Sequence, residues 1–178
     1  MESRTRTLSD YIIEHLEDIG VEHVFTVSGG GSIFLCDALQ RAKRMKYVSM
    51  HHEQACGYAA DAYARIAGLG VCLVTSGPGG TNAVSAVAGA WLDHIPVLFI
   101  SGQAFLNQTI RYHKGLRQLG VQEINIVDIV RPITKYAVMC EVASSVPKQL
   151  ERAIKHATTP RCGPSWIDIP ACIQMAKL

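Results

Sequence analysis

Short apolar segments alternate with longer helical segments along almost the whole chain, and this alternation limits the folds it can adopt. The expected strands are His23–Val27, Tyr47–Met50, Val71–Thr75, Val97–Ser101, Ile133–Val138 and Ser165–Ile169. Several of them, such as VCLVT and PVLFIS, are continuous apolar runs, which are typical of parallel strands covered on both faces. We therefore expect a single α/β domain with a doubly wound, six-stranded parallel sheet flanked by helices.

Segments with apolar residues at helical spacing connect these strands. The expected helices are Leu8–Ile19, Ser32–Arg44, His52–Ile66, Thr81–Trp91, Val121–Val130 and Ser144–Ala157. Thr7 or Ser9 is expected to cap the first helix, and Pro147 fits the first turn of the last. The stretch Phe105–Gly120 has no clear periodicity, so we expect an exposed loop there.

The composition excludes several classes of protein. With 178 residues, 48% of them hydrophobic, the chain is long enough to form one domain with a substantial core. A formal net charge of +2 lacks the basic balance of a nucleic-acid binder. No apolar run reaches the roughly 18 residues that span a bilayer, and the N-terminal MESRTRTLSDY has no apolar signal-peptide core. We expect a cytoplasmic protein without nucleic-acid or membrane partners.

The six cysteines form no CxxC pair. Most of them have small or apolar neighbours, so we expect reduced, buried thiols. His51, His52 and Glu53 are consecutive in the sequence and point in different directions, which disfavours a three-ligand metal site. The sequence therefore predicts no metal bound by this chain.

Polar or glycine-rich segments follow the first four expected strands. They are Ser28–Gly31, His51–Glu53, Ser76–Asn82 and Gly102–Gln103. The carboxyl ends of parallel strands share one edge of a sheet, and ligands bind beyond that edge. We therefore expect one ligand site built from these segments.

The two glycine-rich segments differ in how specific they are. Gly29–Gly31 lacks the third glycine of a dinucleotide fingerprint, since Phe34 stands there, and on spacing alone it indicates a tight strand-to-helix turn. The segment TSGPGGTN predicts a rigid turn in which Asn82 either caps the next helix or binds a ligand. That helix is rich in alanine and glycine, and its small residues serve either packing within the domain or a subunit interface.

Glu53 lies in the first turn of an expected helix. An acid at this position has two interpretations: it interacts favourably with the helix dipole, or it exchanges a proton with a ligand in a poorly hydrated place among Ala55, Gly57 and other small residues. Position alone leaves both open.

Taken together, these segments resemble the thiamine-diphosphate-dependent enzymes of the acetolactate synthase type. The matching segments are GVEHVFTVSGGG, HHEQACGYAADAYAR, TSGPGGTNAVSAVAGAWLDHIPVLFISGQ, GVQEINIVDIVRPITKY and GPSWIDIP. They occur in family order from about Leu8 to Pro170. The region matched is the N-terminal pyrimidine-binding domain, so the resemblance implies that residues 1–178 form this domain, with a core over about 8–170.

The resemblance also implies roles for single residues. Glu53 would hydrogen-bond a ring nitrogen of the cofactor's aminopyrimidine and favour the tautomer that removes the proton from the thiazolium carbon. Gln122 would line the substrate side, and Ser28 departs from the proline found in many members. The cofactor-binding positions that the resemblance implies are Val27, Gly29, Gly30, Glu53, Thr75, Pro78 and Asn82.

Family enzymes bind the diphosphate through Mg²⁺ with a GDG sequence and a later NN pair, and this sequence has neither. The middle domain, which FAD would need in a full-length enzyme, is missing as well. The resemblance thus implies that this chain supplies only the pyrimidine end of the thiamine diphosphate site. It would work in a homodimer or larger homo-oligomer of a longer enzyme, or with a separate pyrophosphate-binding subunit, and would be inactive alone.

The function implied is decarboxylation and carboligation of small 2-oxo acids by a transferase or lyase like acetolactate synthase. Two alternatives stay open: a 2-hydroxyacyl-CoA lyase or 2-oxo acid decarboxylase subunit, and a non-catalytic assembly or regulatory module. The last residues, Ala176-Lys177-Leu178, resemble a peroxisomal address, or they belong to a linker cut at that point.

Overall fold

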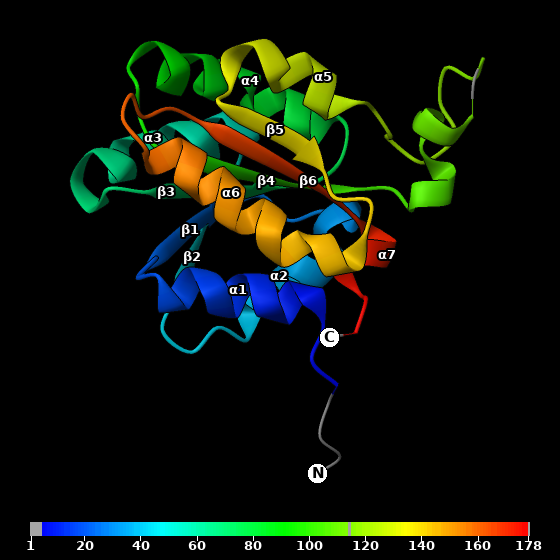
Figure 1. The fold of residues 1–178 in the computed structure, drawn as a ribbon, viewed down its shortest axis with the longest axis horizontal. Coiled ribbons are helices and arrows are strands. Elements are labelled where there is room, and N and C mark those ends of the chain that lie inside the picture. The colour runs from blue at the N-terminus through cyan, green and yellow to red at the C-terminus, as the bar shows by residue number, and fades with distance from the viewer. Residues whose placement is uncertain (1–4, 114, 178) are drawn as a thin grey trace.

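A parallel sheet covered by helices on both faces forms the framework of the computed structural model, which describes residues 5–113 and 115–177 (Figure 1). The six strands are all parallel and lie in the order β2-β1-β3-β4-β6-β5. Their bounds are β1 His23–Thr26, β2 Lys46–Ser49, β3 Gly70–Val74, β4 Val97–Gln103, β5 Tyr136–Met139 and β6 Ser165–Pro170. The predicted doubly wound α/β fold is confirmed.

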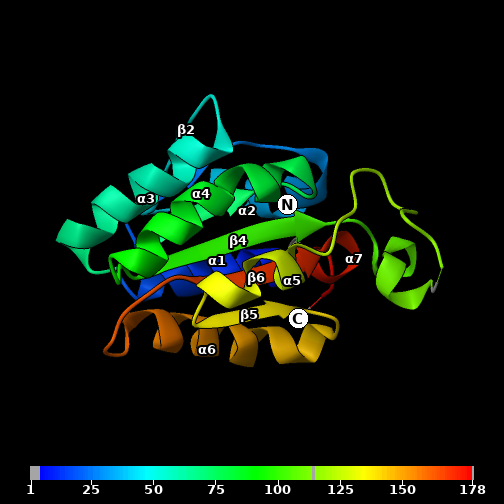
Figure 2. The same cartoon turned by 90° about the horizontal axis from the view of Figure 1, so that it is seen from above.

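The helices cover the two faces of the sheet in separate groups (Figures 1 and 2). One face packs against α1, α2 and α6, and the other against α3, α4 and α5. The helix bounds are α1 Leu8–Asp18, α2 Ile33–Gln40, α3 Glu53–Ala67, α4 Pro78–Leu92, α5 Ile126–Val130, α6 Val146–Thr158 and α7 Ala171–Gln174.

Burial follows the position of each strand in the sheet. The central strands β3, β4 and β6 are buried along their whole length, whereas the edge strand β2 is exposed and the edge strand β5 is half-buried. Because both faces are covered by helices, a central strand needs apolar residues at successive positions. On the face covered by α3 and α4, Phe99 and Trp166 stack with their ring centroids 5.3 Å apart.

The first helix is capped by Thr7. The Thr7 hydroxyl accepts a hydrogen bond from the Asp10 N–H at 3.3 Å, and the Asp10 carboxylate accepts one from the Thr7 N–H at 2.9 Å. Together these bonds form a capping box, which satisfies two donors that the helix leaves unpaired. Ser9, the other expected cap, instead donates to the main-chain oxygen of Gln174 at 2.9 Å.

The helix after β3 begins earlier than expected, at Pro78 rather than Thr81. Proline suits the first helical position, because its φ is already helical and its missing N–H would have no partner there. Gly77 comes before it with a φ of +56°, which favours glycine. Much of the expected turn is therefore the first turn of α4, and Asn82 lies inside the helix rather than at its start.

Two other helices are shorter than expected. The one predicted over Ser32–Arg44 ends at Gln40, and the one predicted over Val121–Val130 is only α5. Asn125 starts α5, since its side-chain oxygen accepts the Asp128 N–H at 3.3 Å.

The strand expected from Ile133 begins at Tyr136, because Arg131–Ile133 form a 3₁₀ turn first. The segment expected as a loop over Phe105–Gly120 contains 3₁₀ turns at Leu106–Gln108 and Ile110–Tyr112. Of the residues discussed above, Lys114 in that loop and Leu178 at the end of the chain lie outside the described residues, as do residues 1–4 of the expected domain.

Three of the cysteines, Cys56, Cys72 and Cys140, are buried as expected, and Cys36, Cys162 and Cys172 are half-buried. All six are free thiols. Within the described residues, none of the helices has the length and apolar character needed to cross a membrane.

Helices α3 and α4 pack unusually closely. A Cβ atom added to Gly57 would lie 2.4 Å from the Ala86 Cβ and 3.2 Å from the Phe99 ring. Ala83, Ala86 and Ala90 are fully buried. These small residues therefore serve packing within the domain, whereas a role of the outer α4 surface in a subunit interface stays a prediction.

We expect Gly57→Ala to lower the free energy of unfolding by about 1–2 kcal/mol, because overpacking outweighs the better helix propensity of alanine. Urea denaturation would measure the change. Gly89→Ala in α4 is the matched control, since its new methyl would lie 3.4 Å from the Tyr58 ring, an ordinary contact. We expect that control to be as stable as the parent chain or up to about 1 kcal/mol more stable. Equal stability of Gly57→Ala and the parent chain would contradict the close packing.

Candidate cofactor site

The candidate site lies beyond the carboxyl ends of β1 and β3. After β1 the chain crosses to β2 on one side, and it returns to form β3 on the other side of β1. The connections after β1 and β3 therefore diverge at this point of the sheet, which is where doubly wound folds bind ligands.

The loops after β1 and β3 are in direct contact. The Gly31 N–H donates to the Thr75 hydroxyl at 3.0 Å. Added Cβ atoms would lie 2.6 Å from the Thr75 Cβ at Gly29 and 2.6 Å from the Ser76 Oγ at Gly31. Glycine at these positions thus permits the close approach of the two loops.

Gly30 differs from its two neighbours. Apart from Gly30 itself, its two chain neighbours and the main chain of its own helical turn, no atom among the described residues lies within 4 Å of the position that a Gly30 Cβ would take. The main chain is therefore open at this point. The predicted tight turn is present, and it leaves room for a ligand on one side.

Glu53 and Asn82 meet at the same edge. The Asn82 side-chain nitrogen donates to the Glu53 Oε2 at 3.0 Å. Glu53 is half-buried in the first turn of α3, whose N-cap is His52; the His52 Nδ1 accepts the Gln54 N–H at 3.2 Å. A Cβ added to Gly79 would lie 3.5 Å from the Glu53 Oε1 and 2.6 Å from a Thr75 methyl. The carboxylate therefore lies among the predicted loop residues.

Gln122 reaches this edge through its main chain. Its φ is +55°, and its carbonyl oxygen would lie 2.0 Å from a Cβ added to Gly77. Two residues with positive φ thus pack directly against each other at the start of α4. The Gln122 residue itself is exposed at the surface.

The two remaining predicted positions belong to the same two connections. Val27 follows β1, is half-buried and packs against the apolar cluster under α3 and α4. Pro78 is exposed at the start of α4. The structure thus places all of the predicted positions along one edge, and their binding roles stay predictions.

Residues 6–129 match the family described as thiamine pyrophosphate enzyme, N-terminal TPP binding domain. The chain belongs to this family. The resemblance based on sequence motifs is therefore confirmed.

The curated relatives of this TPP-binding domain include acetolactate synthases. The chain is 36% identical over 163 residues to the acetolactate synthase large subunit of Haemophilus influenzae, and 39% identical over 170 residues to the chloroplastic acetolactate synthase of Arabidopsis thaliana. These alignments cover 91% and 93% of this chain but only 27% and 24% of the relatives. The chain thus spans about a quarter of the length of the curated relatives it matches.

A buried polar network in the TPP-binding domain was not predicted from the sequence. The Asp168 carboxylate accepts hydrogen bonds from the Ser101 hydroxyl at 2.6 Å and from the Gln103 amide at 3.0 Å. The Trp166 indole N–H donates to the Ser101 Oγ at 2.8 Å. The only signal in the sequence was a few polar residues inside otherwise apolar strands, as in PVLFISGQ and SWIDIP.

Burial raises the pKa of two carboxyl groups in this region, Asp168 and Glu123. Burial raises the pKa of Asp168 to about 7 and outweighs the hydrogen bonds from Ser101 and Gln103, which lower it; the nearby Glu123 raises it further. Burial also raises the pKa of Glu123, whose Oε2 is buried without a hydrogen-bond partner among the described residues.

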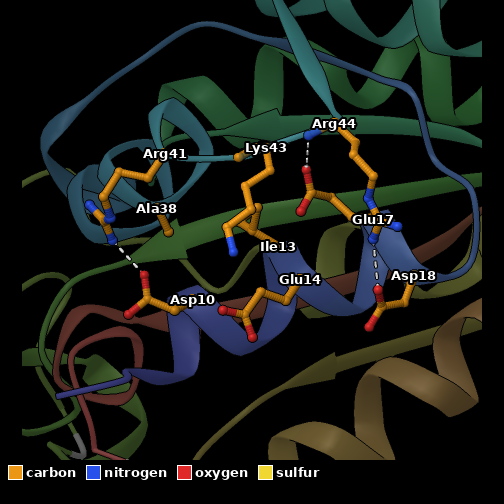
Figure 3. Close-up of a pocket in the computed structure, with 10 residues that line it drawn as sticks. Asp10, Ile13, Glu14, Glu17, Asp18, Ala38, Arg41, Lys43 and Arg44 are labelled. Carbon is orange, nitrogen blue, oxygen red and sulfur yellow. Dashed lines mark hydrogen bonds and ion pairs between the residues drawn. The ribbon is translucent and has the colours of Figure 1, made fainter. Parts of the chain in front are cut away.

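A charged groove of about 800 Å³ lies elsewhere, between α1 and the segment that follows α2 (Figure 3). Arg41 pairs with Asp10 at 2.5 Å and Arg44 with Asp18 at 2.7 Å. The Glu17 carboxylate accepts the Arg44 N–H at 2.6 Å. These contacts hold the chain in a turn after Gln40, which explains why α2 ends early. None of the predicted cofactor positions lines this groove.

The stability of the TPP-binding domain should depend on pH through Asp168. Its pKa rises from an ordinary 3.8 to about 7 on folding, so the folded chain binds a proton more tightly than the unfolded chain. The free energy of unfolding should therefore fall as the pH rises from about 4 to about 7, by a few kcal/mol at most.

The Asp168→Asn variant should lose this fall between about pH 4 and 7, because it removes the titrating carboxyl. Urea denaturation at several pH values would measure the difference from the parent chain. Asp128→Asn, at an exposed position, is the control. It shows how much the loss of one surface carboxylate changes the pH dependence of the free energy of unfolding. Parallel curves for Asp168→Asn and the parent chain would contradict the assignment.

Proposed function

We propose that this chain is the pyrimidine-binding half of a thiamine-diphosphate-dependent enzyme that decarboxylates and joins small 2-oxo acids, like acetolactate synthase. The observation that supports it best is the position of Glu53. Its carboxylate is half-buried at the switch point of the sheet, bonded to Asn82, and next to the loop that follows β3.

The residues present fit a flat nitrogen heterocycle. Asn82 donates to the Oε2 of Glu53, and the Oε1 lies near Gly79, which has no side chain of its own to cover it. Gly30 leaves the main chain of the first loop open. A carboxyl between two small-residue loops is suited to a weakly basic ring nitrogen, with which it can share a proton.

When bound, thiamine diphosphate supplies a nucleophilic carbon and an electron sink for the decarboxylation. Glu53 would hold a proton between its carboxylate and the pyrimidine ring nitrogen. Asn82 fixes the orientation of that carboxylate, and the N-terminus of α3 stabilises its charge. Thr75 keeps the first loop in place through its bond to the Gly31 N–H.

The implied roles of the other loop residues complete the proposal. Val27, Gly29, Gly30 and Pro78 would form the walls around the heterocycle, and Gln122 would lie on the substrate side. The diphosphate and Mg²⁺ would be bound by residues other than these positions.

The missing half of the site belongs to another protein surface in this proposal. A second copy of a longer chain, or a separate pyrophosphate-binding subunit, would supply it. Exposed apolar side chains along α3 and α4 support such a partner: Tyr58, Ile66 and Leu92 are 46%, 93% and 74% exposed.

The Glu53→Gln variant tests the proposed chemistry. The amide cannot share a proton as the carboxyl does, so pyruvate consumption in complex with a pyrophosphate-binding partner should fall about 100-fold or more. Glu22→Gln makes the same chemical change at an exposed position and should leave the rate unchanged. Full activity of Glu53→Gln would contradict the mechanism, and no activity of the parent complex on 2-oxo acids would contradict the proposed function.

A further inference from the structure

Gln174 is buried at the end of the chain's last helix and contacts the first glycine loop. It is the final residue of α7 and is 0% exposed. Its side-chain nitrogen donates to the Gly31 carbonyl oxygen at 2.6 Å and to the Ile169 carbonyl oxygen at 2.7 Å. One amide group thus joins the end of β6 to the loop that follows β1.

The two acceptors fix the orientation of this amide. In the opposite orientation, the Gln174 Oε1 would face two carbonyl oxygens, which repel it. The observed orientation leaves the Oε1 buried without a hydrogen-bond partner among the described residues. An unpaired buried oxygen lowers the free energy of unfolding, so the oxygen is not the reason for a glutamine at this position. The two hydrogen bonds that the side-chain nitrogen donates are.

The main chain of Gly31 is held at both of its polar groups. Its N–H donates to Thr75, and its carbonyl oxygen accepts from Gln174. The same oxygen would lie 2.0 Å from a Cβ added to Gly102, so the carbonyl also packs against the β4 main chain. Gly30, next to it, is the position with open space beside it.

The α7 helix that carries Gln174 is itself anchored. The Ser9 hydroxyl donates to the Gln174 main-chain oxygen at 2.9 Å, and the Leu8 N–H donates to the Ala176 oxygen at 2.9 Å. These bonds tie α7 to the start of α1. Gln174 therefore bonds the loop from a support that the core of the domain holds in place.

We propose that Gln174 is a positioning residue for the cofactor: it holds Gly29–Gly31 in the binding conformation before the pyrimidine ring arrives. The inference rests on the proposed function, because it assigns a cofactor to this loop. A loop that is already ordered loses less conformational entropy on binding, so the same contacts give a higher affinity.

The Gln174→Met variant tests this role, since methionine has a similar length and no donor. We expect the affinity for thiamine diphosphate, measured by titration with Mg²⁺ in complex with a pyrophosphate-binding partner, to fall roughly fivefold or more. The KM for the cofactor should rise by the same factor, and kcat at saturating cofactor should change less than twofold. In the chain without cofactor, amide hydrogen exchange at Gly31 should become faster.

Ser9→Ala is the matched control. It also removes one buried hydrogen bond of Gln174, but at the main-chain oxygen and not at the loop. We expect it to destabilise the chain without changing the affinity for the cofactor or the exchange rate at Gly31. If Gln174→Met does not fold, Gln174→Leu replaces it as the test, because leucine is apolar as well and has no donor at any pH.

The outcomes separate the two proposals. If the parent complex does not bind thiamine diphosphate, the proposed function is wrong. If the parent binds it and the Gln174 variant binds it equally well, or if Ser9→Ala weakens binding as much, the positioning role is wrong. Unchanged exchange at Gly31 in the variant would overturn the positioning role even without a cofactor measurement.

Discussion

The contact between the loops that follow β1 and β3 is the constraint on which the site depends. Side chains are excluded at Gly29 and Gly31, because Thr75 and Ser76 occupy the space that Cβ atoms would need. This contact fixes where the chain leaves β3 and enters α4. The first turns of α4 then bring Asn82 within hydrogen-bond distance of Glu53 on the neighbouring helix. A larger residue in either loop would separate these parts of the edge.

Two buried glutamine side chains, Gln174 and Gln103, donate hydrogen bonds to main-chain carbonyls of the loops at this edge. Gln174 binds the carbonyl of Gly31, and the Gln103 amide donates to the carbonyl of Ile124 at 2.9 Å, two residues beyond Gln122. Gln103 also donates to Asp168, so the segment that contains Gln122 and Ile124 is connected through Gln103 to a carboxyl buried in β6. A buried carboxyl with a raised pKa lowers stability at neutral pH. The network offsets this loss of stability, because its hydrogen bonds fix the positions of several chain segments at once.

The sequence was sufficient to predict the order of the six strands and of the six longer helices, and to place the candidate positions along one edge of the sheet; the short helix α7 was not predicted. Continuous apolar runs identified the covered strands, and the polar residues after them identified the edge. The start of α4 was missed, because the glycines around Pro78 suggest a turn even though they form a first helical turn. The contacts of Gln174 could not be predicted, since they join residues 143 positions apart in the sequence. The pairing of Ser101 with Asp168 depends likewise on the neighbouring positions of β4 and β6, which the order of strands in the sequence does not give.

The incomplete character of the proposed site follows from its chemistry. In the proposal, the neutral ring of the cofactor needs small residues and one carboxyl, which the ends of β1 and β3 and the starts of α3 and α4 would supply. Its diphosphate needs positive charge or a metal ion, and the predicted positions include no basic residue. In the proposed site, a single chain with these residues would recognise the ring but would bind the charged end of the molecule only weakly. Because Glu53 is only half-buried in this chain, a partner that covers the outer surface of α3 and α4 would both complete the ligand contacts and dry the carboxyl that shares the proton.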